Sequence, residues 1–262
     1  VGEIASVGEA VTQFRVGDQV IAFAGVRMRC HAEFCTLRET AAVIKRPPGL
    51  SDAEAAALCF GGTTALHFLR DVARLQPGQR LLILGASGAV GTAAIQIARH
   101  MGAEVTGVSS APNHDLLRRL GAQHVLDYKT QDFSTAADRY DVILDAVDAT
   151  TYAKAKRALV PKGKFLMVAA DLPAMLRAIG TLFTQQKALS AVSPERREDI
   201  QFLADLAAKG AYRPVIDSTF PLAKIQEAHA RVESGRKRGS VAVSYTHLRA
   251  HETKANLVCR LL

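Results

Sequence analysis

A glycine-rich turn between an apolar strand and a helix constrains the fold of this chain more than any other feature. Residues 81–110 read LLILGASGAVGTAAIQIARHMGAEVTGVSS, which predicts a strand, a turn, a helix and a second strand. In this pattern Gly85 permits a tight turn, Gly88 lets the backbone approach a pyrophosphate, and Gly91 lets the helix pack closely on the sheet. Because the free N–H groups at a helix N-terminus favour an anion, the unit predicts a dinucleotide site.

Apolar and helical segments alternate along the middle of the chain. The apolar segments are RLLIL, EVTGV, HVLDY, YDVILDAV and KFLMVA, and the helical ones include GTAAIQIARHM, HDLLRRL and TYAKAKRAL. Strand and helix in alternation imply a parallel sheet with right-handed crossovers, and continuous apolar strands imply a sheet covered on both faces. We therefore predict an α/β fold, a doubly wound parallel sheet of the Rossmann type.

The flanking segments have a different character. Residues 1–50 are strand-like, and Ser51 with Glu54 predicts a capping box at the start of an Ala-rich helix. Near the other end, RPVIDSTF, PLAKIQEAHARVES and GSVAV predict a strand, an amphipathic helix and a closing strand.

The composition argues against several kinds of partner. No run of about twenty apolar residues is present, so we expect no membrane segment. The net charge is +8, but the basic residues are scattered among acids except in ESGRKRGS, and no aromatic residues interleave with them, so we expect no nucleic-acid partner. The four cysteines, Cys30, Cys35, Cys59 and Cys259, form no CxxC pair, which favours a reducing cytoplasm over a disulfide framework.

The end of the second strand bears on which dinucleotide binds. A site selective for NAD usually has Asp or Glu there, which accepts from the ribose 2′-OH. Here that end is Ser109 followed by Ser110, so no carboxylate repels a 2′-phosphate and two hydroxyls can donate to it. The next cation is Arg118, on the following helix. We expect NADPH as the cofactor and keep NADH as the alternative. The serines could instead cap the following helix, and that role is compatible with either cofactor.

Taken in order, these residues resemble the medium-chain dehydrogenase/reductase superfamily. The matching segments include FRVGDQVIAF, LSDAEAAALCFGGTTALHFL, GASGAVGTAAIQIA, LGAQHVLDY, ALVPKGKFLMV and PVIDSTFPLAKIQEAHARVESG, and they cover nearly all of residues 1–243. The resemblance is to the zinc-free quinone oxidoreductase branch, which includes members named NAD(P)-dependent alcohol dehydrogenase. It implies a Rossmann domain inserted into a GroES-like β-barrel catalytic domain.

The resemblance implies a division of the chain into four segments. Residues 1–50 are expected to form the C-terminal part of the GroES-like domain, 51–212 the Rossmann domain, and 213–243 a return to the GroES-like domain. Residues 244–262 are expected to form a non-native tail. The segment VSYTHLRAHET, residues 243–253, looks like the translation of a sequencing adapter, so we expect the tail not to be natural protein. About seventy residues of the family's first domain precede the position of Val1, within the usual domain size.

The resemblance also bears on metals. Zinc-dependent relatives take a catalytic cysteine ligand at the position that Phe60 occupies, and Cys59 lies one residue early. Phe cannot ligate Zn²⁺, and a catalytic zinc site needs three protein ligands. We therefore expect no metal and interpret Cys59 as a small buried hydrophobe.

Cofactor-binding positions are carried over one at a time. Asn113 stands where some quinone reductases have a Lys that holds the 2′-phosphate, which weakens the preference for NADPH, and Asp148 lies in VDA where the family commonly has VGG. The implied cofactor-binding residues are Thr64 near the nicotinamide, the pyrophosphate turn (Gly85, Ala86, Ser87, Gly88, Ala89, Val90 and Gly91), the ribose phosphate end (Ser109, Ser110 and Asn113), Tyr128 near the adenosine phosphate, and Ala146, Val147, Ala169 and Ala170 along the cofactor.

The implied activity is zinc-independent hydride transfer between NAD(P)H and a quinone or an α,β-unsaturated carbonyl. No Ser/His/Asp or Cys/His constellation argues for hydrolysis, and we name no catalytic residue. Two alternatives stay open: an enoyl reductase module of a multidomain synthase, and a non-catalytic protein that binds NADPH or nucleic acid on the same fold. The resemblance further implies a homodimer formed through the sheet edge near KALSAV, residues 187–192.

Overall fold

The computed structural model describes residues 1–25, 30–135, 139–169, 172–245 and 258–261. Contacts between residues divide the chain into two compact units, one formed by residues 1–63 together with 195–262 and the other by residues 64–194. The four-segment division implied by the resemblance stays a prediction. None of the described helices is both long and apolar enough to cross a membrane.

The unit of residues 64–194 is built on a six-stranded sheet in which every neighbouring pair of strands is parallel. This arrangement confirms the predicted α/β fold of the Rossmann type. The chain runs outward through three strands, then returns to the opposite side of the first one, as a doubly wound sheet requires. In spatial order the strands are β10 (Lys187–Ser190), β9 (Leu159–Met167), β8 (Tyr140–Asp145), β5 (Arg80–Leu84), β6 (Glu104–Ser109) and β7 (His124–Asp127).

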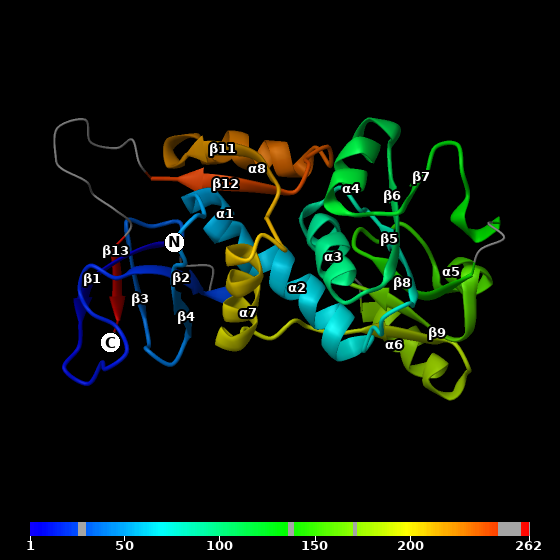
Figure 1. The fold of residues 1–262 in the computed structure, drawn as a ribbon, viewed down its shortest axis with the longest axis horizontal. Coiled ribbons are helices and arrows are strands. Elements are labelled where there is room, and N and C mark those ends of the chain that lie inside the picture. The colour runs from blue at the N-terminus through cyan, green and yellow to red at the C-terminus, as the bar shows by residue number, and fades with distance from the viewer. Residues whose placement is uncertain (26–29, 136–138, 170–171, 246–257, 262) are drawn as a thin grey trace. The chain divides into compact units, whose positions relative to one another are not determined.

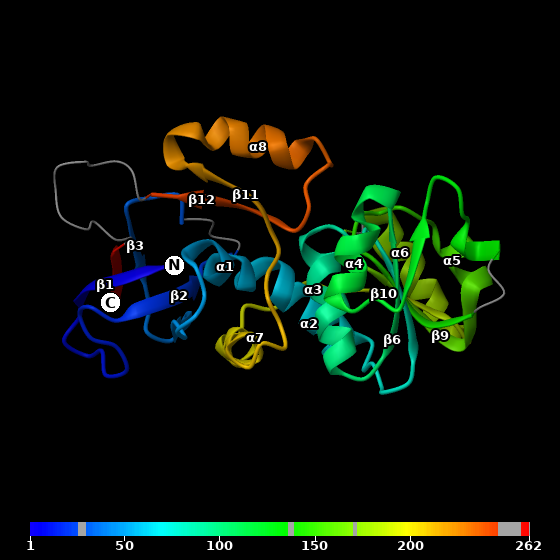
Figure 2. The same cartoon turned by 45° about the horizontal axis from the view of Figure 1, so that its top comes forward.

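Helices cover both faces of this sheet (Figures 1 and 2). On one face lie α3 (Ala89–His100) and α4 (His114–Leu120), and on the other lie α5 (Tyr152–Ala158) and α6 (Leu172–Gly180). The unit also contains the short helices η3 (His67–Val72), η4 (Ala111–Asn113), η5 (Phe133–Thr135) and η6 (Thr181–Phe183), and most of α2 (Thr63–Leu66).

The core of this unit lies between the sheet and its helices. Leu82, Ile143 and Phe165, from three adjacent strands, are completely buried in one cluster. Burying such a side chain contributes about 1.5–3 kcal/mol. These strands are buried on both faces, as expected for a parallel sheet that helices cover on each side.

The other unit contains a five-stranded sheet and two groups of helices. In spatial order the strands are β3 (Phe34–Leu37), β13 (Val258–Leu261), β1 (Gly2–Val7), β2 (Gln19–Phe23) and β4 (Ala42–Lys45), so β13 comes from the tail segment. The chain then enters α1 (Asp52–Ala57), whose predicted capping box between Ser51 and Glu54 is confirmed, and the π-helix η2 (Leu58–Gly62). Helix α7 (Arg197–Ala208) belongs to this unit as well.

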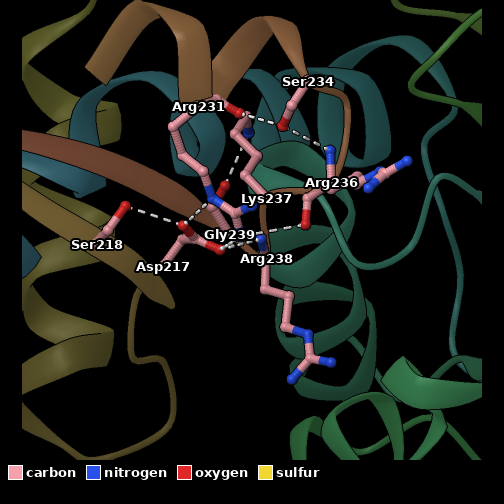
Figure 3. A network of polar contacts seen from close by, with 8 residues as sticks. All are labelled: Asp217, Ser218, Arg231, Ser234, Arg236, Lys237, Arg238 and Gly239. Atoms are coloured by element: carbon pink, nitrogen blue, oxygen red, sulfur yellow. Dashed lines mark hydrogen bonds and ion pairs between the residues drawn. The ribbon is translucent and has the colours of Figure 1, made fainter. Parts of the chain in front are cut away.

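An acid at the start of a small two-stranded sheet organises the last part of this unit (Figure 3). The sheet pairs β11 (Ile216–Pro221) with β12 (Ser240–Ser244), and the chain between them contains η7 (Leu222–Lys224) and α8 (Ile225–Glu233). The Asp217 carboxylate accepts two hydrogen bonds from the Arg231 guanidinium, at 2.8 and 2.7 Å, and one from the Arg238 N–H at 2.8 Å. The basic run ESGRKRGS is therefore held to the Asp217 carboxylate through the Arg238 N–H.

Candidate functional site

The carboxyl ends of β6, β5 and β8 lie next to one another in the sheet. Between β5 and β8 the strand order reverses, because the chain continues from β5 to β6 on one side and later returns to β8 on the other. Ligands of open α/β sheets bind at such a switch point, outside the carboxyl ends of the strands. The glycine turn, Ser109 with Ser110, and Ala146 with Val147 follow these three strand ends.

Two glycines of the turn have roles inside the protein. Gly85 has φ +73°, a left-handed conformation that favours glycine, and a Cβ there would lie 2.6 Å from Cγ1 of Val147. A Cβ on Gly91 would lie 2.4 Å from the Gly85 carbonyl oxygen and 2.6 Å from Cα of Ala86. Helix α3 therefore packs directly against the turn, and neither position accepts a side chain without a shift.

Gly88 differs, because nothing within the protein excludes a side chain there. Its φ is −78°, and a Cβ would be 3.4 Å from the Gly85 carbonyl oxygen, an ordinary contact. The first backbone bond of α3 described in the structure runs from the Thr92 N–H to the Gly88 carbonyl at 2.9 Å, so the amides of residues 89–91 precede the helical ladder. A glycine that the fold does not need, beside free amides, fits a ligand phosphate that approaches the backbone.

At the end of β6 the two serines are not equivalent. Ser109 is buried, and its hydroxyl donates to the Ser110 carbonyl at 3.2 Å. Ser110 is partly exposed, and its Oγ accepts from the Asn113 side-chain amide at 3.2 Å. Arg118 forms an ion pair with Asp115 at 3.1 Å on the surface of α4. Of the two serines, Ser110 is therefore the more accessible to a ligand.

The segment after β8 comes back against the glycine turn. The Ala146 N–H donates to the Leu84 carbonyl of β5 at 3.2 Å, and Val147 is 55% exposed although its side chain borders Gly85. Asp148 is exposed and has φ +53°, the left-handed conformation. Glycine adopts this conformation without the steric cost that an L-residue carries there.

Sequence reasoning missed Asp145, the last residue of β8. Its side chain is 2% exposed, and its two oxygens accept from the N–H groups of Val147, Ala149 and Thr150 at 3.1, 3.0 and 3.0 Å. Burial raises the pKa of this carboxyl, while the three backbone donors act in the opposite direction and the neighbouring Asp148 raises it further. The only signal in the sequence is an acid that ends the apolar strand YDVILD.

The remaining predicted positions are spread over the unit. Tyr128 is exposed directly after β7, the neighbour of β6, and Ala169 is exposed shortly after β9, the neighbour of β8. Thr64 is buried in α2, and no described hydrogen bond joins it to the strand ends, so its place beside the nicotinamide stays a prediction. Ala170 lies outside the described residues.

In the other unit, Phe60 stands at the position where the resemblance implies a zinc-binding cysteine in zinc-dependent relatives. Phe60 is 64% exposed in η2, whereas Cys59 is buried, and burial raises the pKa of its thiol to about 12. Across the described ranges, no three His, Cys, Asp or Glu residues are grouped so as to hold a metal ion.

Comparison with known proteins places these observations in a family. A family model described as "Zinc-binding dehydrogenase" matches residues 120–243, and one described as "Alanine dehydrogenase/PNT, C-terminal domain" matches residues 55–163. The chloroplast envelope quinone oxidoreductase homolog of Arabidopsis thaliana is 32% identical over 254 residues, which cover 92% of this chain and 77% of that protein.

Solved structures agree with the sequence comparison. The quinone oxidoreductase from Coxiella burnetii is 25% identical with a TM-score of 0.77, and the match covers 91% of this chain and 75% of that one. The structure described as CurK enoyl reductase is 26% identical with a TM-score of 0.76, covering 92% and 76%. The chain thus belongs to the medium-chain dehydrogenase/reductase superfamily, in its quinone oxidoreductase-like branch. It is an NAD(P)H oxidoreductase of that family.

Proposed function

We propose that this protein transfers hydride from NADPH to a quinone or an α,β-unsaturated carbonyl without zinc. The observation that carries the proposal is the open backbone at Gly88, next to the first amides of α3 and at the reversal of strand order. The similarity to proteins named quinone oxidoreductase supports the electron-poor acceptor. The exposed phenyl group of Phe60, at the position where zinc-dependent relatives have a ligand, supports chemistry without a metal.

The chain's own residues bind and orient the dinucleotide in this proposal. The amides of residues 89–91 receive the pyrophosphate, and Ser110 faces the ribose end. Val147 and the backbone beyond β9 lie along the nicotinamide half. A bound nicotinamide supplies the hydride, and the protein supplies orientation and a site poor in water.

We favour NADPH because the end of β6 has no acid that would require a free 2′-OH. Ser110 is partly exposed, and Asn113 already donates to its hydroxyl, which leaves the Ser110 O–H free to donate to a phosphate oxygen. The phosphate end has no lysine at position 113, so NADH stays a usable cofactor with lower affinity.

The decisive experiment combines cofactor binding with turnover. NADPH and NADH affinities are measured by fluorescence titration, and oxidation of each is followed with a quinone and with a simple enone. Gly88→Ala is expected to fold like the wild type and to bind either dinucleotide at least about tenfold more weakly. The added methyl group would keep the pyrophosphate away from the backbone amides at the start of α3. Gly180→Ala is the matched control, because a Cβ there meets nothing within 4 Å.

Each outcome separates one part of the proposal. Normal binding by Gly88→Ala would contradict the site. Binding without turnover of any quinone or enone would favour the non-catalytic alternative, and equal use of NADH would overturn the cofactor preference. Loss of activity on prolonged dialysis against a zinc chelator would contradict the zinc-free mechanism.

A second candidate is reduction of a carrier-bound enoyl chain. The similarity to the structure described as CurK enoyl reductase favours it. The test compares a free enone with the same enoyl group attached to an acyl carrier protein. A strong preference for the carrier-bound form would support the enoyl reductase alternative over the free quinone or enone.

We also propose a homodimer and a cytoplasmic location. Strand β10 lies at the edge of the six-stranded sheet. Phe183, which precedes it in the chain, is 94% exposed, and Val192, which follows it, is exposed as well. An open strand edge with exposed apolar side chains is suited to pairing between copies. Light scattering of the wild type and of Phe183→Asp tests the dimer. None of Cys30, Cys35 and Cys59 forms a disulfide, which is consistent with a reducing compartment, and cell fractionation tests the location.

A further inference from the structure

The buried carboxylate of Asp145 holds a loop of five residues at the candidate site. We propose that Asp145 is a positioning residue that fixes residues 146–150, so that Val147 is held against the glycine turn where the dinucleotide binds. The inference rests on the proposed function, because it assigns a further residue to the same site. It begins from three hydrogen bonds that converge on one side chain.

Only a carboxylate satisfies all three donors. One oxygen accepts from Val147 and Ala149, and the other accepts from Thr150. An asparagine has a single side-chain oxygen, so it can accept from two of the donors while its NH₂ group opposes the third. No described ion pair involves Asp145, so the cost of burying the carboxylate is offset by these amides alone.

The loop that these bonds fix connects to the turn at two points. The Ala146 N–H donates to the carbonyl of Leu84, the residue immediately before Gly85. The Val147 side chain occupies the space above Gly85, where an added Cβ would come within 2.6 Å of it. Since the Val147 N–H is itself held by Asp145, the carboxylate determines where this side chain lies.

The position of Asp145 in the sheet makes this control direct. Asp145 lies opposite Leu84 of β5 and Met167 of β9 in the strand register, and its own carbonyl accepts from the Val168 N–H at 3.0 Å. Its backbone is thus fixed on both sides by neighbouring strands. Because the end of β8 is held by both neighbouring strands, the two carboxylate oxygens of Asp145 are well suited to set the conformation of residues 146–150.

The test is a double-mutant cycle read out as dinucleotide affinity. NADPH and NADH are titrated by calorimetry into the wild type, Asp145→Asn, Val147→Ala and the double variant. Asp145→Asn is expected to raise Kd about 5- to 20-fold, as for loss of a hydrogen bond to a charged group. If Asp145 acts through Val147, the double variant binds no more weakly than the weaker single variant.

Binding stoichiometry separates positioning from a general loss of structure. A misfolded fraction lowers the number of sites without changing Kd, whereas loss of positioning changes Kd and leaves the stoichiometry intact. Asp141→Asn is the matched control, since Asp141 lies at the other end of β8 and accepts from the Arg80 N–H at 2.8 Å. It is expected to leave Kd unchanged.

Three results would overturn the inference: an unchanged Kd in Asp145→Asn, fully additive effects in the cycle, or an equal effect of Asp141→Asn. If Asp145→Asn does not fold, Val147→Ala decides alone, because Val147 is largely exposed and its truncation leaves the core intact; an unchanged Kd then contradicts the inference. A wild type that binds neither dinucleotide refutes the proposed function, and the inference with it. A wild type that binds, together with an unaffected Asp145→Asn, refutes only the inference.

Discussion

The side chain of Val147 occupies the space that a Cβ on Gly85 would need, and the two residues follow adjacent parallel strands. The glycine turn is therefore shaped from two directions. Helix α3 packs against it through Gly91, and the loop after β8 covers it through Val147. The glycine turn and the segment after β8, which we propose to lie along the nicotinamide, thus pack against each other.

Gly85→Ala tests this packing. The substitution places a side chain at φ +73° and against Val147, so we expect the free energy of unfolding to fall by about 1–3 kcal/mol. Adding Val147→Ala removes the steric part and should recover a portion of the loss, while the backbone strain remains. Urea denaturation of the single and double variants measures the steric and the strain contributions to the loss of unfolding free energy. If the double variant regains the wild-type unfolding free energy, the backbone strain at position 85 is negligible.

Asp148→Gly should stabilise the protein and tighten dinucleotide binding. Glycine adopts φ +53° without the steric cost that an L-residue carries there, so we expect a gain of about 0.5–1 kcal/mol in unfolding free energy. Because Asp148 follows Val147, which borders Gly85, removal of its negative charge should lower Kd about twofold. Asp148→Ala removes the charge but keeps the Cβ, so it should improve binding without improving stability.

Ser110→Asp should reverse the cofactor preference. An acid at the end of β6 repels a 2′-phosphate and accepts from a free 2′-OH, so NADPH binding should weaken about tenfold or more while NADH binding is retained. Ser110→Asn is the neutral control of similar size. Parallel weakening of both cofactors by Ser110→Asp would indicate that position 110 does not face the ribose.

Acid should destabilise the protein partly through Glu54. The Arg213 guanidinium beside it lowers the pKa of Glu54 to about 2, from an ordinary value of 4.5, and hydrogen bonds from Ser51 contribute in the same direction. A depressed pKa in the folded state stabilises the protein above about pH 4.5, and this stabilisation is lost as the pH falls from 4.5 toward 2. Urea midpoints measured from pH 7 to pH 3 should fall more steeply for the wild type than for Glu54→Gln, which keeps the capping geometry.

The surface pair of Asp115 and Arg118 is the control for that experiment. Both side chains are largely exposed, so Asp115→Asn should change the midpoint little at any pH. An equally steep pH dependence in Glu54→Gln and the wild type would show that other carboxyl groups dominate.

The fold could be predicted because its signals are local. Alternation of apolar strands with helices indicated the parallel sheet, and the spacing of Gly85, Gly88 and Gly91 indicated the turn. The burial of Ser109 and the partial exposure of Ser110 could not be predicted from the sequence. Strand β6 is buried on both faces, so buried and exposed side chains do not alternate along it as they do in a half-buried strand.

Asp145 could not be assigned from the sequence for a similar reason. Its partners are backbone N–H groups, which every residue except proline carries, so no residue type marks them. Only the way residues 146–150 fold back over the strand end shows that three donors converge. The sequence likewise gave no sign that α7 would pack in the same compact unit as residues 1–63.

The interrupted course of that unit has a consequence for synthesis on the ribosome. Residues 64–194 are continuous, so all six strands of their sheet are synthesised before residue 195. The other unit is split, and its β11 cannot find its partner β12 until residues 240–244 have emerged. Because domains fold as their residues become available, the unit of residues 64–194 is expected to form before the unit whose last strands come from residues 216–244.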